Sequence, residues 1–219
     1  MKLKLPSLKR ALDVAVALPA LILSSPVQAA AALAVRVSLG SPVLFRQRRP
    51  GLHGEPFTLY KFRSMLPEDP ARHADEDEEY RLTRVGKFIR STSIDELPSL
   101  WNVVRGDMSL VGPRPLQMAY LTRYSPRQAR RHEVKPGLTG LAQVSGRNDL
   151  TWEERFELDV EYVDGQSLLL DLRILLRTVV VVLNRTGISE EGRSTMSIFY
   201  GSQPHADVAE EPAGSALKA

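Results

Sequence analysis

The sequence contains no cysteine among its 219 residues. Disulfide bridges, zinc sites built on thiolates and a cysteine nucleophile are therefore excluded, and the composition fits a reducing compartment. The net charge is also small, at +3, and the pI is near 9.3. This mild basicity does not separate an anionic membrane surface from a nucleic acid as the partner. The length suits one domain of moderate size plus an anchor.

Charge is absent altogether between residues 14 and 35. At ~1.5 Å per residue this run would form a helix of roughly 33 Å, long enough to cross a hydrocarbon layer of about 30 Å. Ser25 and Pro26 lie in its middle, and a proline inside a helix costs ~3 kcal/mol or forces a kink. Basic residues flank both ends, which indicates that both stay in the cytoplasm. We therefore predict a re-entrant anchor, broken at Ser25–Pro26, whose hydroxyl groups satisfy the freed backbone groups.

Two other interpretations of this segment remain open. One is an ordinary single membrane span. The other is a signal peptide, because Val27-Gln28-Ala29 imitates a small-residue cleavage site. The apolar run continues past that site to Val35, which argues against cleavage.

The stretch from Val43 to Met65 predicts two short strands around a turn at Gly51 to Gly54. Basic and aromatic side chains are interleaved along it. Such a pattern could bind nucleic acid by stacking and phosphate contact, or it could lie on lipid headgroups. A solvated hairpin is the plain alternative.

Three further segments carry charge without an obvious chemical role. Residues 75–79 are all acidic, but consecutive carboxylates without fixed ligand spacing do not make a calcium loop. The basic stretch at 124–135 predicts a surface helix in contact with solvent or headgroups. Residues 159–185 predict one amphipathic helix that lies in the core or along a membrane interface. Asp171 and two arginines interrupt this helix, so it is a poor transmembrane candidate.

The candidate chemistry is concentrated in residues 90–115, where the adjacent carboxylates Asp95 and Glu96 follow a cluster of hydroxyl groups. The structural interpretation is a helix start, with Ser93 as N-cap and Glu96 completing a capping box. Apolar residues within 97–104 fall at helical spacing, so a buried helix face is expected in either case. The functional interpretation uses the same geometry, because a helix N-terminus attracts phosphate and a carboxylate there could meet a bound phosphoryl group.

The run SIDELPSLWNVVRGDMSLVGPRP, residues 93–115, closely resembles the signature of the bacterial sugar transferases called monotopic phosphoglycosyl transferases. Further blocks resemble the family in the same order: the hairpin positions Gln47, Arg49 and Gly51, the KFRSM run at 61–65, and KPGLTGLAQVSGRN at 135–148. The last block alone is neither a phosphate-binding P-loop nor a dinucleotide fingerprint. The resemblance covers roughly residues 9–201.

The resemblance implies an enzyme that moves a sugar 1-phosphate from a nucleotide diphosphate sugar to a polyprenol phosphate in the membrane. It assigns the nucleophile to Asp95 and a supporting acid/base role to Glu96. A carboxylate that attacks a diphosphate must overcome repulsion between anions, so we expect Mg²⁺ at Asp95 and Glu96. Contacts to substrate and phosphate oxygens are expected from Arg63, Arg90, Arg114, Gln143, Arg147 and Lys61.

We predict an α+β, mainly helical fold in three parts. These are an N-terminal membrane anchor (1–40), a cytosolic catalytic domain with a β-hairpin (41–201) and a disordered tail (202–219). The predicted partners are a UDP-sugar, undecaprenyl phosphate and membrane phospholipid but no nucleic acid, with a homodimer left open. The predicted location is the cytoplasmic face of the bacterial inner membrane. The short form and the block at 187–201 favour an N-acetylated amino sugar, with UMP as a product.

The competing class is a non-catalytic membrane-associated adaptor whose basic hairpin binds anionic lipid or nucleic acid. Its binding would weaken steeply with salt and would not depend on Asp95. A secreted domain, left after signal cleavage, is a further alternative. Neither explains why the acidic pair, the PRP segment and the glycine block occur together.

Overall fold

The computed structural model describes residues 5–67, 80–146, 150–184 and 199–201. The acidic run at 75–79, Arg147, most of the block at 187–201 and the tail at 202–219 lie outside these residues, so the predictions made for them stay predictions. The described chain is mainly helical, with two small sheets of two strands each. This agrees with the predicted α+β class.

The N-terminal segment forms two helices, α1 (Leu5–Leu23) and α2 (Ser25–Ser38), which meet at an angle of 58°. The bend lies at Ser24, one residue before the predicted break, because Pro26 is accommodated in the first turn of α2, where a helix does not need its N–H. The hydroxyl of Ser24 donates to Leu21 O at 3.3 Å and accepts from Gln28 Nε2 at 2.9 Å. Ser24 and Gln28 therefore satisfy backbone and side-chain groups at the bend.

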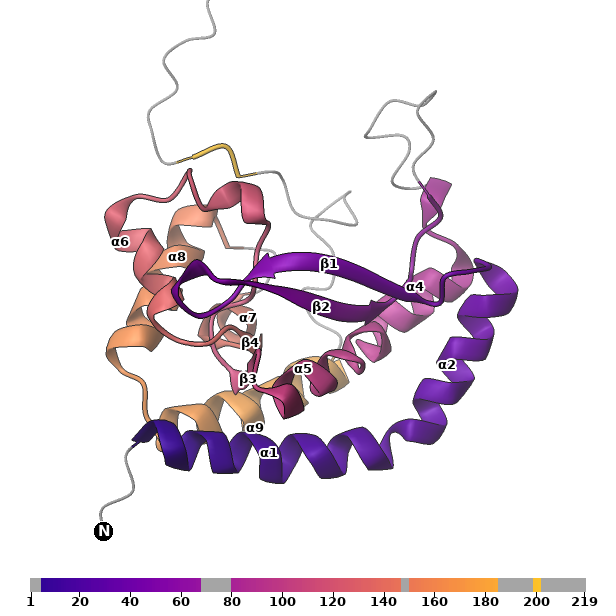
Figure 1. Cartoon of the computed structure of the whole chain (residues 1–219), viewed down its shortest axis with the longest axis horizontal. Coiled ribbons are helices and arrows are strands. Elements are labelled where there is room, and N and C mark those ends of the chain that lie inside the picture. The colour runs from indigo at the N-terminus through magenta and orange to yellow at the C-terminus, as the bar shows by residue number, and fades with distance from the viewer. Residues whose placement is uncertain (1–4, 68–79, 147–149, 185–198, 202–219) are drawn as a thin grey trace, which may run out of the picture.

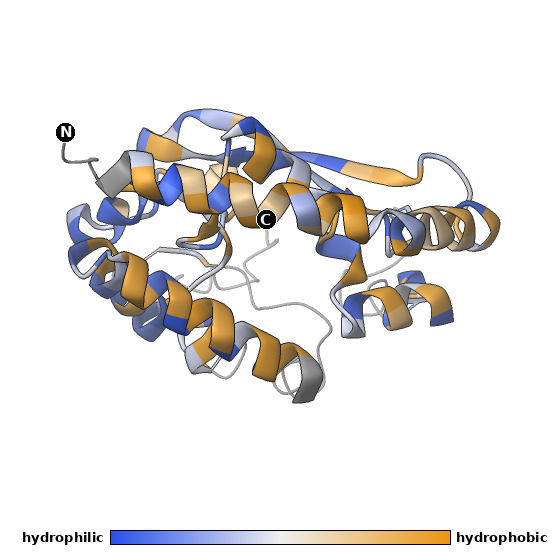
Figure 2. Ribbon diagram, turned by 90° about the horizontal axis from the view of Figure 1, so that it is seen from below, coloured by the Kyte–Doolittle hydropathy of each residue, from blue (hydrophilic) through white to orange (hydrophobic). Residues whose placement is uncertain are grey.

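No single described helix is both long and apolar enough to cross a membrane. Together, α1 and α2 reach the necessary length and composition, but only as a bent pair. Large apolar side chains are exposed along both of them and along α9 (Leu168–Asn184). Both α1 and α9 run along the lower part of the molecule in Figure 1, and apolar residues predominate on these helices in Figure 2. The arrangement is compatible with a re-entrant anchor.

The predicted hairpin is confirmed. Strands β1 (Leu44–Pro50) and β2 (Pro56–Phe62) pair antiparallel through seven residues each, and a 3₁₀ turn joins them at Leu52–Gly54. The free edge of β2 is covered by the helix α5 (Ser99–Arg105). Asn102 accepts from Tyr60 N and donates to Thr58 O, at 3.2 and 2.7 Å, and Ser99 donates to Tyr60 O at 2.7 Å. These side chains use strand groups that would otherwise lack partners.

The second sheet is a parallel pair, β3 (Ser109–Val111) and β4 (Gly137–Thr139). The stretch between them contains the 3₁₀ turn η3 (Met118–Tyr120), the short helix α6 (Pro126–Ala129) and the 3₁₀ turn η4 (Arg130–Glu133). After β4 come α7 (Leu141–Ser145) and α8 (Trp152–Asp164). The main core gathers apolar residues from α1, β2, α5, β3, α7, α8 and α9. Helix α1 is thus part of the same core as the other described elements.

The prediction of one helix over residues 159–185 is wrong, since α8 and α9 are separate helices. Gly165 caps the end of α8, and the hydroxyl of Ser167 accepts from Leu170 N at 3.2 Å to begin α9. The residue types that stop and start a helix are separated here only by Gln166. After the break, α9 packs against α7, β3 and β4.

Candidate active site

The acidic pair lies on a 3₁₀ turn, η2 (Ile94–Glu96), between α4 (Arg84–Ser91) and α5. Ser93 has a left-handed backbone (φ 57°) and its side chain forms no cap hydrogen bond. The predicted capping box is therefore wrong. Glu96 does not turn back to the backbone because two cations bind it instead. The carboxylate of Glu96 is therefore not used up in capping a helix.

Glu96 is the centre of an ion-pair network. Its Oε1 lies 2.7 Å from Lys61 Nζ on β2 and 2.5 Å from Arg114 Nη2. Burial would raise the pKa of Glu96, but the charges of Arg114 and Lys61 outweigh it and hold this pKa well below the ordinary value. Glu96 is therefore a permanent anion that fixes two cations in position.

Asp95 has the opposite electrostatic character. Burial, together with the neighbouring charge of Glu96, raises the pKa of Asp95 to about 6 despite the opposing effects of Lys61, Arg114 and Arg90. Among the described residues, its carboxylate takes part in no hydrogen bond or ion pair. A carboxylate with this pKa is mostly ionised at pH 7 and has little solvation to lose before it reacts. It is suited to act as a nucleophile.

A pocket opens beside the pair, with about 350 Å³ of empty space that includes open solvent. Its charged lining consists of Arg49, Lys61, Glu96 and Arg114. Apolar groups of Leu59, Met108 and Leu138 complete it. Cations outnumber carboxylates in this lining, which favours an anionic ligand.

Arg114 is presented by the tight segment that follows β3. Gly112 N donates to Thr139 O and Gly137 N donates to Pro113 O, both at 2.9 Å. The two chains approach so closely that a Cβ atom on Gly137 would lie 2.1 Å from Gly112 N. No side chain fits there, so the glycine block serves backbone packing behind Arg114.

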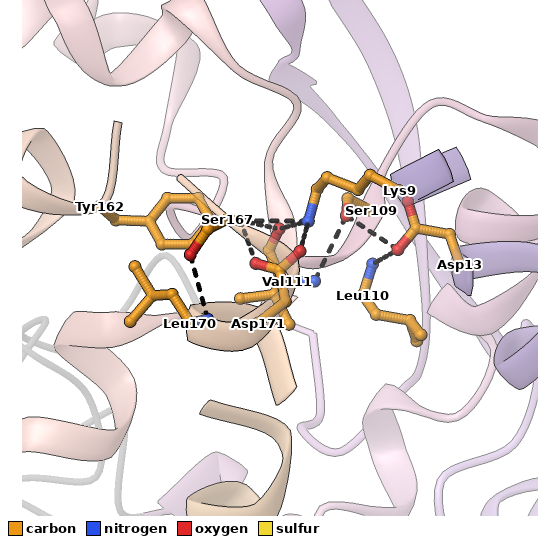
Figure 3. Close-up of polar contacts among 9 residues, drawn as sticks. All are labelled: Lys9, Asp13, Ser109, Leu110, Val111, Tyr162, Ser167, Leu170 and Asp171. Atoms are coloured by element: carbon orange, nitrogen blue, oxygen red, sulfur yellow. Dashed lines mark hydrogen bonds and ion pairs between the residues drawn. The ribbon is translucent and has the colours of Figure 1, made fainter. Parts of the chain in front are cut away.

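A buried network secures the start of this segment (Figure 3). Lys9 on α1 donates to Val111 O at 3.0 Å and to Tyr162 at 3.1 Å, and it forms an ion pair with Asp171 at 2.6 Å. Tyr162 in turn donates to Asp171 at 2.7 Å. On the same face of α1, Asp13 accepts from Ser109 and Leu110 N, both at 2.9 Å. Helix α1 is therefore tied to β3 by buried polar contacts.

A second buried ion pair secures the end of the segment. Arg131 is only 2% exposed, and its Nη2 lies 2.7 Å from Asp159 on α8 and 2.7 Å from Arg114 O. The prediction of a basic surface helix at 124–135 is thus wrong for this arginine. α6 is only four residues long, and the following turn directs Arg131 inward to the acceptors. Lys9 and Arg131 hold the two ends of the segment that carries Arg114.

The other predicted site residues lie in different places. Arg90 is close enough to Asp95 to lower its pKa. Arg63 instead donates to Ser41 O at 3.0 Å and to Leu39 O, so it binds the end of α2 and not the acidic pair. Gln143 donates to the carbonyl of Leu138, a pocket residue, at 3.1 Å. Gln143 therefore lies one layer behind the pocket.

Two parts of the site escaped the sequence-based prediction. Arg49 lines the pocket, whereas Asp159 contributes through Arg131. Strand alternation could have identified Arg49, because it shares a face with Lys61 across the hairpin register. No local signal marks Asp159, whose partner lies 28 positions earlier in the chain.

The donors available for a metal are few. Within the ranges that the structure covers, no group of three or more His, Cys, Asp or Glu side chains could hold an ion. The paired carboxylates Asp95 and Glu96 remain, and Mg²⁺ is commonly bound by one or two carboxylates together with substrate phosphates. The donor set therefore fits Mg²⁺ held jointly with a phosphate ligand.

Comparison with known proteins gives consistent results. A family model described as bacterial sugar transferase matches residues 5–185. The uncharacterized sugar transferase EpsL of Bacillus subtilis is 53% identical over 195 residues, which are 89% of this chain and 96% of that protein. A UDP-glucose:undecaprenyl-phosphate glucose-1-phosphate transferase of Caulobacter vibrioides is 46% identical over 189 residues, covering 80% of this chain and 69% of that one.

Some relatives are much longer than this chain. The undecaprenyl-phosphate galactose phosphotransferase of Salmonella typhimurium is 42% identical over 197 residues, which are 82% of this chain but only 41% of that protein. The matched part of each relative includes the segment that holds the acidic pair here, because the alignments cover most of this chain. The similarity therefore extends well beyond a short motif, and the chain belongs to the bacterial sugar transferase family.

Proposed function

We propose that this protein transfers a sugar 1-phosphate from a UDP-sugar to undecaprenyl phosphate, through a covalent phosphosugar on Asp95, and releases UMP. The observation that carries the proposal is the contrast between two adjacent carboxylates. Glu96 is held as an anion by Lys61 and Arg114, whereas Asp95 has a raised pKa and no ion-pair partner among the described residues. The names of the relatives, which specify undecaprenyl-phosphate transfer of glucose or galactose 1-phosphate, support the same reaction class.

The first step is attack by a carboxylate oxygen of Asp95 on the phosphorus that bears the sugar. The bond from this phosphorus to the bridging oxygen breaks, and UMP leaves with the electron pair. In the second step, an oxygen of undecaprenyl phosphate attacks the same phosphorus and displaces Asp95. The products are undecaprenyl diphosphate sugar and a regenerated carboxylate.

The surrounding residues lower the cost of bringing anions together. Lys61 and Arg114 are fixed before the substrate arrives, so they need no reorganisation to neutralise phosphate oxygens. Glu96 holds them in place, and its lowered pKa makes it a poor base. We therefore assign Glu96 to positioning these cations in preference to proton transfer. Mg²⁺ held by Asp95 and Glu96 would supply further neutralisation of the diphosphate and the departing UMP.

The membrane location is proposed on physical grounds. One substrate is a soluble nucleotide sugar, and the other is a lipid whose phosphate lies at the membrane surface. The bent pair α1–α2 and the exposed apolar side chains of α9 would place the pocket at that surface. We propose a monotopic placement at the cytoplasmic face of the bacterial inner membrane. A non-catalytic adaptor would need the same apolar surface but not the electrostatic arrangement at Asp95.

The test is UMP release by the purified protein with Mg²⁺ and undecaprenyl phosphate. A panel of donors sets UDP-N-acetylated amino sugars, which we propose from the resemblance of the block at 187–201 to family members that use them, against UDP-glucose and UDP-galactose. We expect turnover to require the lipid phosphate and to disappear in Asp95→Asn. Asp164→Asn is the matched control, because Asp164 is exposed and pairs with Arg130 at the surface. Normal turnover by folded Asp95→Asn would refute the proposed mechanism.

A further inference from the structure

Arg49 differs from the arginines that brace the fold. Arg131 bridges Asp159 and Arg114 O, and Arg10 donates to the carbonyls of Val103 and Val104. Each of these arginines joins segments that lie far apart in the sequence. The hydrogen bond of Arg49, from Nη2 to Gln47 Oε1 at 2.6 Å, stays within its own strand. This contact therefore does not connect β1 to any other element.

The guanidinium of Arg49 also has unused hydrogen-bonding capacity. Its Nε is buried and has no hydrogen-bond partner among the described residues. Burying such a donor without a partner is unfavourable unless a ligand completes the contact. The amide of Gln47 restrains the side chain, so little conformational freedom remains to be lost on binding.

The register of the hairpin directs Arg49 to the pocket. Arg49 pairs with Phe57 and Gln47 pairs with Leu59, and Leu59 and Lys61 lie on the same face of β2. Arg49, Leu59 and Lys61 all line the pocket. Arg48 belongs to the opposite face and is exposed. The two neighbouring arginines therefore have different environments.

Among the residues that the structure describes, no carboxylate forms an ion pair with Arg49. Burial lowers its pKa, and so does the positive charge of Arg114, which shows that these two cations are close. The pocket lining contains three cations, Arg49, Lys61 and Arg114, against the single carboxylate of Glu96. Counting Asp95 as a second carboxylate still leaves an excess of positive charge. An anion bound between the cations would remove their mutual repulsion.

We propose that Arg49 forms, with Arg114 and Lys61, an oxyanion subsite that binds a phosphoryl group of a substrate. This inference rests on the proposed function and adds to it a residue for phosphate recognition. The phosphoryl group belongs either to the diphosphate of the soluble donor or to the lipid phosphate. A guanidinium is suited to this role because its planar fork can donate two parallel hydrogen bonds to phosphate oxygens.

The experiment is direct calorimetric titration of the full-length protein in detergent with inorganic pyrophosphate, which requires no turnover. We expect Arg49→Gln to bind pyrophosphate about 10- to 100-fold more weakly than wild type, as expected for the loss of charge-assisted hydrogen bonds. The matched control is Arg48→Gln, which removes the same charge from the exposed face of the same strand and should bind like wild type. Equal weakening in both variants would overturn the proposal, and so would unchanged binding in Arg49→Gln.

A second variant is needed in case Arg49→Gln does not fold normally. If Arg49→Gln does not show the wild-type melting temperature, Arg49→Lys decides the question, since it keeps the charge but loses the fork. We expect Arg49→Lys to bind about tenfold more weakly than wild type. Wild-type affinity in a folded Arg49→Lys, or no binding of pyrophosphate by the wild type itself, would overturn the subsite.

Steady-state kinetics separate the two sources of the phosphoryl group. If Arg49→Gln has a higher KM for the UDP-sugar than wild type and an unchanged KM for undecaprenyl phosphate, the subsite belongs to the donor. If only the KM for undecaprenyl phosphate rises, the subsite belongs to the lipid. If no UDP-sugar supports turnover but Arg49→Gln still weakens pyrophosphate binding, the proposed reaction fails while the subsite stands.

Discussion

The buried cations Lys9 and Arg131 have carboxylate partners, whereas the pocket cations outnumber the carboxylates beside them. Lys9 pairs with Asp171 and Arg131 with Asp159, and each cation also binds a backbone carbonyl of the segment that presents Arg114. At the pocket, Glu96 alone serves both Lys61 and Arg114. The first arrangement is complete within the protein, while the second leaves positive charge available to a ligand. The comparison separates charges that hold the fold from charges that remain available to an anionic ligand.

Breaking a completed pair should have the largest effect on stability. We expect Lys9→Met to lower the free energy of unfolding by about 3–5 kcal/mol, because Asp171 would remain buried without a cation. Thermal unfolding in detergent measures this loss. The double variant Lys9→Met/Asp171→Asn should recover a large part of it, since the carboxylate is then removed and the amide oxygen can still accept from Tyr162. If the double variant lost as much free energy of unfolding as the two single variants together, this account would be contradicted.

Removing the carboxylate at the pocket should affect catalysis more than stability. We expect Glu96→Gln to lower kcat by about 100-fold, near 2.7 kcal/mol, because Lys61 and Arg114 would lose the anion that positions them. UMP release measures the rate. An unchanged kcat would show that these cations are positioned without Glu96.

The pH dependence should report Asp95 directly. Its raised pKa of about 6 means that the proposed nucleophile is protonated below this pH, so kcat/KM should fall about tenfold per pH unit on the acid side and level off above it. In Glu96→Gln the acid limb should move to lower pH, because the charge of Glu96 is one cause of the raised pKa. A pH–rate profile for each protein checks both statements. An acid limb that stays in place would exclude Asp95 as the titrating group.

An exposed ion pair provides the smallest expected effect. Arg127 and Glu157 are 2.6 Å apart, but both side chains are more than half exposed. We expect Arg127→Ala to leave the melting temperature and UMP release unchanged, because exposed pairs gain little over solvation. Thermal unfolding of Arg127→Ala and Lys9→Met, measured in parallel, compares the exposed pair with the buried pair directly. A loss comparable with that of Lys9→Met would remove the distinction between buried and exposed pairs.

The sequence identified the elements whose signals are local. The strands around the turn at 51–54 follow from turn residues and alternation. The family resemblance, and not spacing, named Lys61 and Arg114 together with the acidic pair, and the structure brings both cations to Glu96. The capping box failed because Ser93 adopts a left-handed backbone and Glu96 has stronger partners elsewhere. Local pattern rules do not include those distant cations, so the helix rules misassigned the geometry around Glu96.

The buried ion pairs could not be predicted in the same way. Lys9 and Asp171 are 162 positions apart, and each reads in isolation as an ordinary charged residue. The same is true of Arg131, whose basic neighbours indicate a surface. Only the meeting of α1 and the start of α9 at Val111, and the packing of η4 against α8, show which of several charges is buried. Burial of a charge is a tertiary property that requires knowledge of its partner.

The contacts of α1 also determine how the protein can be produced. A fragment that began at residue 41 would lack Lys9, Ala17 and Val35, and so would lose a donor to Val111 and residues of two apolar cores. The opposite side of α1 exposes large apolar side chains. We therefore expect no active water-soluble fragment to be obtainable by removing residues 1–40. Under the proposed membrane placement, insertion into the bilayer and folding of the segment around Arg114 would belong to a single maturation event.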